Sequence, residues 1–254
     1  MVGGGPGSRS PNDVSYGLAV PPTISAPTSS SQTTQTDDMP RLVPWAGLAA
    51  MLGGLLGIVY FPLHAAAFFA TSTEPESEWV IAWSDAFRGL AVPLFTFASP
   101  DDVHTTYARL AVFVLMGFTV GLVALHSRQS AVAGRVERWG FRITLVAMVA
   151  FVASVIADFW LGGFDWVFLV LEVPALLLLM VGSPLFGIGT LRAGLAPRLG
   201  AWLLATGAFP GMFLLIFATG HLSGGLLMLD LAWVVLGHAL WALRDGEPER
   251  RPSV

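Results

Sequence analysis

The sequence predicts an all-α fold, a polytopic bundle of transmembrane helices. Of the 254 residues, 54% are hydrophobic and only 12% are charged, which is more apolar surface than a soluble domain of this size could bury. Six segments contain the roughly 20 mostly apolar residues that a helix needs to cross about 30 Å of hydrocarbon. Because backbone groups in lipid must be hydrogen-bonded within their own segment, these six segments are predicted to be helices.

The chain divides into a tail, a membrane domain and a second tail. Residues 1–41 are dominated by Gly, Pro, Ser and Thr and contain too few large apolar side chains to offset the chain entropy of folding. We predict that this tail is disordered; an alternative is that it docks a partner. It lacks the basic start and short apolar run of a secretory signal. Residues 42–243 are predicted to form the transmembrane domain, and 244–254 a short charged tail.

The predicted spans are separated by segments rich in Gly, Pro and charged residues. Four spans contain a proline, which predicts that they bend. Short connections predict that spans three and four, and spans five and six, are antiparallel neighbours. The six spans are residues 42–70, 107–125, 141–161, 166–191, 199–219 and 222–243, and the four prolines are Pro62, Pro174, Pro184 and Pro210.

One apolar stretch, residues 79–98, is ambiguous. It is long enough to span, yet Asp85 and Arg88 interrupt it, and its large apolar residues recur at helical spacing. This pattern is typical of an amphipathic helix in the membrane interface. The alternative is a seventh span, at the cost of placing an acid and an arginine in lipid. Two start signals flank the stretch: a capping box from Thr73 to Glu76, and a cap at Ser99 followed by Pro100.

Arginine predicts the orientation, because basic residues favour cytoplasmic connections. The connections after spans two, four and six carry arginines, whereas the alternate connections are short or acidic. We predict that the protein lies in the inner membrane of the cell. With six spans, both ends of the chain are then predicted to lie in the cytoplasm. The arginines are Arg128, Arg135, Arg138 and Arg142 after span two, Arg192 and Arg198 after span four, and Arg244, Arg250 and Arg251 after span six.

Pairs of glycines four residues apart predict where helices approach closely, since lipid provides no hydrophobic drive between them. We interpret the pairs as contacts within one chain, and favour this over the alternative of a homo-oligomer seam. The pairs are Gly53 with Gly57, Gly117 with Gly121, and Gly207 with Gly211.

The C-terminal half carries a resemblance. The run from Gly187 to Arg198 combines a helix end, a stop at Gly194 and a restart at Pro197. A span rich in Leu, Ala and Gly follows, and the last span ends in the six residues 236–241, LGHALW. This half resembles the corresponding part of many uncharacterised bacterial multi-pass membrane proteins. The resemblance is structural, and it implies no activity.

Four polar residues within the spans form the candidate site. An ionisable side chain in lipid is costly unless it is paired, neutral or hydrated. His64, Asp158, Glu172 and Asp230 each lie roughly 6 to 10 Å below the predicted outer face, counting 1.5 Å per residue. We predict that they line an outward-facing site that binds or moves a small cation, a proton or a small solute.

Three alternatives remain open. In the first, the acids only fix helix packing, and the protein is a non-catalytic membrane component that acts through partners. In the second, the ligand held by His64 and the three acids is a divalent metal ion. In the third, haem is bound by histidine pairs, His64 with His221 near the outer face and His126 with His238 near the inner face.

Composition excludes other classes. The net charge of −4 argues against a nucleic-acid partner, so the expected surroundings are the lipid bilayer and a small ligand. The absence of cysteine excludes thiolate metal sites, and the absence of lysine excludes a phosphate loop of the G-x-x-x-x-G-K type. No serine-nucleophile motif G-x-S-x-G occurs. We therefore predict no catalytic residue, and the sequence assigns no cofactor.

Overall fold

The computed structural model describes residues 39–71, 78–162 and 165–245, which form helices and, within these ranges, no strand. Residues 1–38 of the predicted disordered tail, the capping box at Thr73 to Glu76 and the last nine residues lie outside the described ranges, whereas residues 39–41, predicted to belong to the tail, begin the first helix. The helices of the first half are α1 (Met39–Thr71), α2 (Glu78–Leu90), α3 (Val92–Phe95), α4 (Pro100–Ala108), α5 (Ala111–Gln129) and α6 (Arg135–Phe159).

The helices of the second half are interrupted by π-helical turns. A π-helical turn, η1, precedes α8, and a second one, η2, lies between α9 and α10, where Phe209 has extended backbone angles before Pro210. The elements are α7 (Asp165–Val167), η1 (Phe168–Glu172), α8 (Val173–Ala193), α9 (Arg198–Thr206), η2 (Gly207–Gly211), α10 (Met212–Thr219), α11 (Leu222–Gly225), α12 (Leu227–Trp241) and the 3₁₀ turn η3 (Ala242–Asp245).

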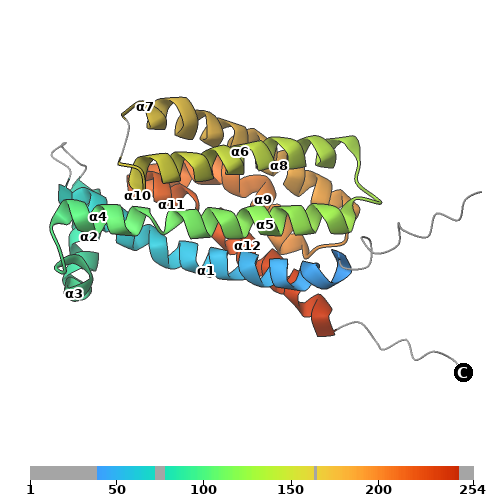
Figure 1. Cartoon of the computed structure of the whole chain (residues 1–254), viewed down its shortest axis with the longest axis horizontal. Coiled ribbons are helices and arrows are strands. Elements are labelled where there is room, and N and C mark those ends of the chain that lie inside the picture. Colours follow the sequence, from blue (N-terminus) through green and yellow to red (C-terminus); the bar gives the residue numbers. More distant parts are fainter. Residues whose placement is uncertain (1–38, 72–77, 163–164, 246–254) are drawn as a thin grey trace, which may run out of the picture.

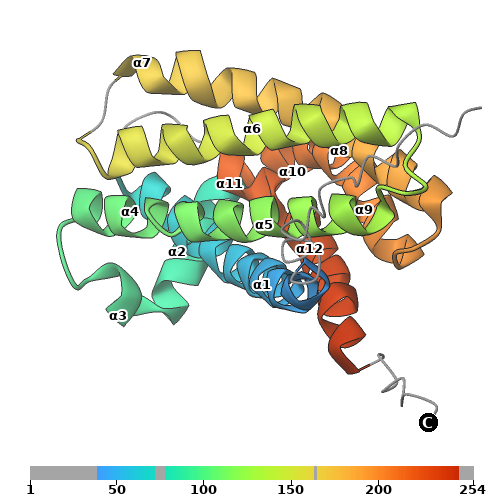
Figure 2. The ribbon, with the colours of Figure 1, turned by 45° about the vertical axis from the view of Figure 1, so that its right-hand side comes forward.

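The long helices run side by side along the bundle, and consecutive long helices are neighbours (Figures 1 and 2). Helix α1 contacts α5, and the contacts continue from α5 to α6, α8, α9 and α12, which packs back on α1. The six helices therefore form a closed ring. The predicted antiparallel pairs, α6 with α8 and α9–α10 with α12, are confirmed by these contacts.

Five helices, taken across their joined segments, are long and apolar enough to cross a membrane. The last traversal, α12, is apolar but only 15 residues long, because Leu222–Gly225 forms a separate short helix before it. The second span begins at Pro100, not at the predicted residue 107. Large apolar side chains cover the outside of the ring, among them Phe217, which is 79% exposed. Such a surface supports a protein embedded in lipid.

The ambiguous stretch 79–98 is divided into two short helices at the end of the bundle. Helix α2 has 13 residues and α3 has four, and both are shorter than the roughly 20 residues that a span requires. Arg88 pairs with Asp85 on the same face of α2, so each charge has its partner nearby. The length of these helices argues against the seventh span.

Two boundary predictions are confirmed. Ser99 is the N-cap of α4: its hydroxyl oxygen accepts a hydrogen bond from the backbone N–H of Asp102, at 3.3 Å, and Pro100 follows as the first helical residue. Helix α8 ends at Gly194, whose φ of 68° is the left-handed conformation that glycine adopts at little cost. Helix α9 then begins directly after Pro197.

The predicted glycine pairs all face other helices of the same chain. A Cβ atom on Gly53 would lie 3.2 Å from the Cα atom of Gly117, so α1 and α5 meet backbone to backbone. These surfaces are therefore already covered within one chain. The remaining contacts join Gly57 to Asp230, Gly121 to Ala50, and both Gly207 and Gly211 to Met228.

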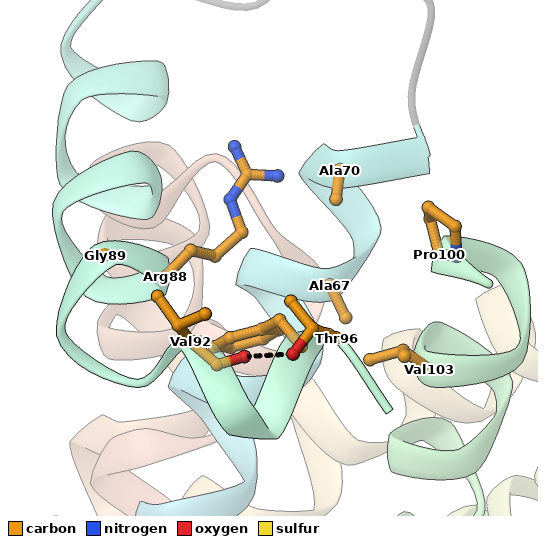
Figure 3. Close-up of a pocket in the computed structure, with 9 residues that line it drawn as sticks. Ala67, Ala70, Arg88, Gly89, Val92, Thr96, Pro100 and Val103 are labelled. Atoms are coloured by element: carbon orange, nitrogen blue, oxygen red, sulfur yellow. Dashed lines mark hydrogen bonds between the residues drawn. The ribbon is translucent and has the colours of Figure 1, made fainter. Parts of the chain in front are cut away.

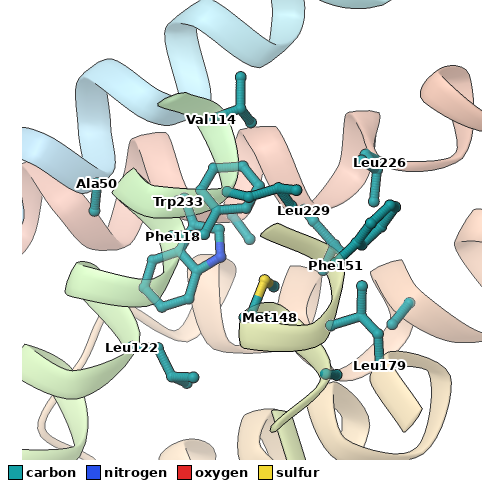
Figure 4. Close-up of a cluster of buried hydrophobic side chains, with 14 of the residues drawn as sticks. Ala50, Val114, Phe118, Leu122, Met148, Phe151, Leu179, Leu226, Leu229 and Trp233 are labelled. Atoms are coloured by element: carbon teal, nitrogen blue, oxygen red, sulfur yellow. The ribbon is translucent and has the colours of Figure 1, made fainter. Parts of the chain in front are cut away.

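The centre of the ring is filled by apolar side chains (Figure 4). The rings of Phe118 and Trp233 stack with centroids 5.9 Å apart, and Met148 lies beside them. All three side chains are almost fully buried. This core closes the interior of the bundle roughly midway along the helices.

Candidate functional site

A cavity of about 590 Å³ lies inside the ring, at the end of the bundle opposite the arginine-bearing connections. Its wall is formed by α1, α4 with α5, α6 and the turn η1 before α8, together with the turn at Gly220 and the short helix α11. It is lined by Tyr60, His64, Phe68, His104, Ala111, Leu115, Phe151, Val155, Asp158, Phe159, Phe168, Glu172, Gly220, His221, Leu222, Ser223 and Leu226.

One face of α1 provides the first wall. Tyr60, His64 and Phe68 follow one another at intervals of four residues, which places them on the same side of a helix. The Tyr60 hydroxyl and the His64 Nδ1 atom are hydrogen-bonded at 2.8 Å, and the two rings stack with centroids 5.0 Å apart. His64 is only 7% exposed, and its Nε2 atom has no hydrogen-bond partner among the described residues.

Three histidines from distant parts of the chain meet in this cavity. The ring of His104 stacks on that of His64, with centroids 4.8 Å apart and planes inclined by 10°. The ring of His221 stands nearly perpendicular to that of His64, with centroids 4.9 Å apart. His104 belongs to α4, and His221 precedes α11. His104 lies outside the predicted second span, which begins at residue 107, and is therefore not among the predicted site residues.

The helix-start motif at Ser99 and Pro100 could have indicated that His104 belongs to the site. If the helix that begins at Pro100 continues without interruption, then His104, Ala111 and Leu115 share one face. All three line the cavity. Reading the start motif and the span as one helix would therefore have placed His104 inside the bundle.

Two carboxyl groups complete the site. Asp158 lines the cavity from the last turn of α6, and Glu172 lines it from the π-helical turn η1. The Ser154 hydroxyl donates a hydrogen bond to Oε2 of Glu172 at 3.3 Å, and Glu172 is 9% exposed. Proline at position 174 cannot donate a backbone hydrogen bond to the preceding turn, which is compatible with the widened helix at Glu172. Such π-turns are frequent at functional sites.

Asp230 corrects the predicted site. It does not line the cavity; its carboxyl group lies against Gly57 of α1, it is 1% exposed, and its Oδ1 atom has no partner among the described residues. Gly57 precedes His64 by seven residues, or about 10 Å along the helix. The four residues therefore do not share one depth: Asp230 lies level with Gly57, about 10 Å along α1 from His64.

His221 is held in one orientation by the turn that contains it. Its Nδ1 atom accepts a hydrogen bond from the backbone N–H of Ser223 at 3.1 Å, so we assign the proton of the neutral ring to Nε2. Burial, and next the neighbouring His104, lower the pKa of His221 to about 4. The imidazole is therefore neutral at pH 7.

This pKa predicts a loss of stability in acid. Between pH 6.5 and 4 the unfolded imidazole binds a proton that the folded one does not, so stability falls with falling pH and levels off below about pH 4. The loss is up to about 3 kcal/mol. The measurement is the unfolding temperature of wild type and His221→Asn in detergent from pH 7.5 to 3.5.

Asparagine retains an acceptor for the Ser223 N–H but does not titrate. We expect a shallower pH dependence in this variant. The other ionisable groups that line the cavity titrate in both proteins, so they largely cancel in the comparison. Parallel curves would show that the environment of His221 does not lower its pKa.

A second cavity, of about 350 Å³, lies at the same end, between α1, α2, α3 and α4 (Figure 3). Its lining is apolar apart from Arg88, which pairs with Asp85, and Thr96, whose hydroxyl donates to the carbonyl of Val92 at 3.1 Å. No acid or histidine lines it among the described residues. It therefore offers less chemistry than the histidine and carboxylate cavity.

The haem alternative receives little support from the histidine positions. The His64 and His221 rings are in direct contact, which leaves no room for a porphyrin between them. At the other end, His126 Nδ1 is hydrogen-bonded to Glu137 Oε1 at 2.7 Å, and its ring stacks on Phe141 at 3.7 Å. His238 is exposed on α12.

A buried polar network that no sequence motif indicated lies at the opposite end of the bundle, near the arginine-bearing connections. Gln129 donates from Nε2 to Glu137 Oε1 at 2.9 Å and to the Thr190 hydroxyl at 3.1 Å. These bonds join α5, α6 and α8, and all three side chains are buried. Because a buried polar group is costly when unpaired, this network specifies how the three helices pack.

Comparison with known proteins gives no further guide: no family model, curated protein or solved structure matches this chain. The resemblance of its C-terminal half to other bacterial membrane proteins stays a prediction. The function must therefore be argued from the site itself.

Proposed function

We propose that this protein is a multi-pass inner-membrane protein that binds a small cation or other small solute from the outer side of the membrane. The observation that carries the proposal is the convergence of Asp158, Glu172 and three histidines in one cavity. Ionisable residues are rare within membrane helices, and those that line a cavity there mark ligand or ion pathways. The volume of this cavity, about 590 Å³, lies within the range of small-molecule sites.

The cavity is closed toward the other end of the bundle. Phe151, Leu115 and Leu226 line it and also belong to the apolar core, in which Phe118 and Trp233 stack (Figure 4). In this state a ligand enters and leaves through one end only. If the protein moves its ligand across the membrane, this core has to open.

The proposed orientation places the cavity outside and both chain ends in the cytoplasm, with six spans. The arginines after α5 and α8 support it, because they lie at the end of the bundle where α1 begins and α12 ends. Asp101 and Asp102 lie at the opposite end, in the first turn of α4.

Single cysteines test the orientation and the site together, since the chain has none of its own. Ala98→Cys and Ala131→Cys replace exposed alanines in loops at opposite ends of the bundle. In intact cells, a membrane-impermeant thiol reagent should label only Ala98→Cys. Labelling of Ala131→Cys alone would reverse the orientation.

Leu222→Cys tests access to the cavity that Leu222 lines. We expect a methanethiosulfonate carrying trimethylammonium to react faster than one carrying sulfonate by at least about tenfold, because the carboxylates attract cations and repel anions. Ala98→Cys gives the ratio of the two reaction rates, cationic to anionic reagent, at an exposed position. Equal ratios at the two positions, or no labelling of Leu222→Cys from outside, would contradict the proposal.

A further inference from the structure

We infer that the ligand is a small organic ammonium ion, held between carboxylates and aromatic walls, rather than a metal ion. The inference rests on the proposed function and names its ligand class. Three observations carry it: the arrangement of the histidines, the aromatic lining, and the distribution of charge around the cavity.

The histidines are not arranged as metal ligands. Within the described part of the chain, no group of three or more His, Asp or Glu residues is positioned to hold a metal ion. The His64 and His104 rings lie face to face, so their in-plane lone pairs do not point at a common centre. The Nδ1 atoms of His64 and His221 are already engaged by Tyr60 and Ser223. The imidazoles therefore act as flat walls.

Phenylalanine rings line the same cavity and pack against the histidine rings. Phe68 lies 4.8 Å from the His221 ring and 5.6 Å from the His104 ring, measured between centroids. Phe159 lies 6.0 Å from His104 and 6.3 Å from His64. Aromatic faces attract ammonium groups, and several faces around one space favour a compact organic cation. A bare metal ion would leave most of the about 590 Å³ unfilled.

The charges around the cavity favour a cation. Asp158 and Glu172 are the acids among its described lining residues, no arginine is among them, and His221 is neutral at pH 7. The nearby Arg109 is engaged elsewhere: its Nε donates to the Phe159 carbonyl at 2.8 Å, and its guanidinium lies over Trp160. A bound cation would favour the ionised form of both carboxyl groups.

One buried atom indicates a polar group on the ligand. His64 Nε2 is inaccessible to solvent and has no hydrogen-bond partner among the described residues, although His64 lines the cavity. Buried polar atoms are normally paired. If the His64 ring turned to expose this atom to the cavity, a ligand with a hydroxyl or N–H group beside its cationic centre would provide the missing partner.

Choline and its uncharged isostere 3,3-dimethylbutan-1-ol provide the test, because they share shape and hydroxyl and differ in the charged nitrogen. Binding of each probe, and of Zn²⁺ alone, is measured by isothermal titration to the purified protein in detergent. We expect choline to bind at least about tenfold more tightly than the isostere. In Glu172→Gln, choline should bind at least about tenfold more weakly.

Asp101→Asn is the matched control, because it removes an exposed acid at the same end that does not line the cavity. It should leave choline affinity unchanged. The unfolding temperature of each variant shows that it is folded. Equal binding of choline and its isostere, Zn²⁺ binding that His64→Gln abolishes, or equal loss in Asp101→Asn and Glu172→Gln would each overturn the ligand class.

The two proposals fail in different ways. If choline does not bind but the cavity cysteine Leu222→Cys still reacts from outside with the cationic preference, the ligand class is wrong and the outward cation site stands. If Leu222→Cys is not labelled from outside, and does not react faster with the cationic than with the anionic reagent, the proposed function itself fails.

Discussion

Replacing Gly237 with alanine is expected to lower the free energy of unfolding by about 2 to 3 kcal/mol and the unfolding temperature by at least about 5 °C. A Cβ atom at this position would lie 2.5 Å from the backbone N of Met51 and 2.6 Å from the carbonyl oxygen of Gly47. Both are backbone atoms of α1, so no side chain can rotate away. Helices α1 and α12 would have to separate.

The effect should be large because this contact closes the ring. Helix α12 is the last long helix of the described chain, and it packs against α1, the first. Helices in lipid associate through close packing, since burial from water does not hold them together. Loss of the contact would therefore open the ring at the junction between its first and last helices.

The control is Gly89→Ala in α2, where an added Cβ atom meets nothing within 4 Å. Alanine is favoured over glycine inside a helix by up to about 1 kcal/mol, so this variant should be as stable as wild type or slightly more stable. Thermal unfolding in detergent measures both. Equal stability of the two variants would show that α1 and α12 are not packed backbone to backbone.

Removing both carboxylates of the cavity is expected to weaken the binding of small cations at least about 100-fold while the protein becomes no less stable. In Asp158→Asn with Glu172→Gln, the amides keep the shape of the side chains but remove the charge that attracts the ligand. Burying acids within a membrane protein costs free energy, so their neutralisation should preserve or raise the unfolding temperature. Binding and thermal unfolding are measured on the same preparation.

Asp230→Asn distinguishes a binding role from a packing role. Asp230 is also a buried acid, but it lies against Gly57 and outside the cavity lining. We expect its replacement to change cation affinity by less than about threefold. If the double variant binds as tightly as wild type, the acids serve packing alone, and the protein is better explained as a component that acts through partners.

Much of the fold could be predicted from local sequence, because a membrane imposes one requirement on each segment independently. Length and apolarity were enough to locate the five helices that are long and apolar enough to span a membrane, and the cap at Ser99 and the stop at Gly194 were visible in short motifs. Residues 79–98 were recognised as atypical because Asp85 and Arg88 interrupt them. These features depend on neighbours within a few residues along the chain.

The sequence by itself therefore determined the helical membrane class, the helix boundaries at Ser99 and Gly194, and three cavity residues: His64, Asp158 and Glu172. Only the tertiary structure decided that these three meet, that His104 and His221 join them, and that Asp230 packs against Gly57 instead. The reason is physical: periodicity and length fix the depth of a residue along its own helix, whereas the direction of its side chain depends on how each helix is rotated against its neighbours. That rotation is set by contacts such as Gly53 with Gly117, between residues distant in sequence.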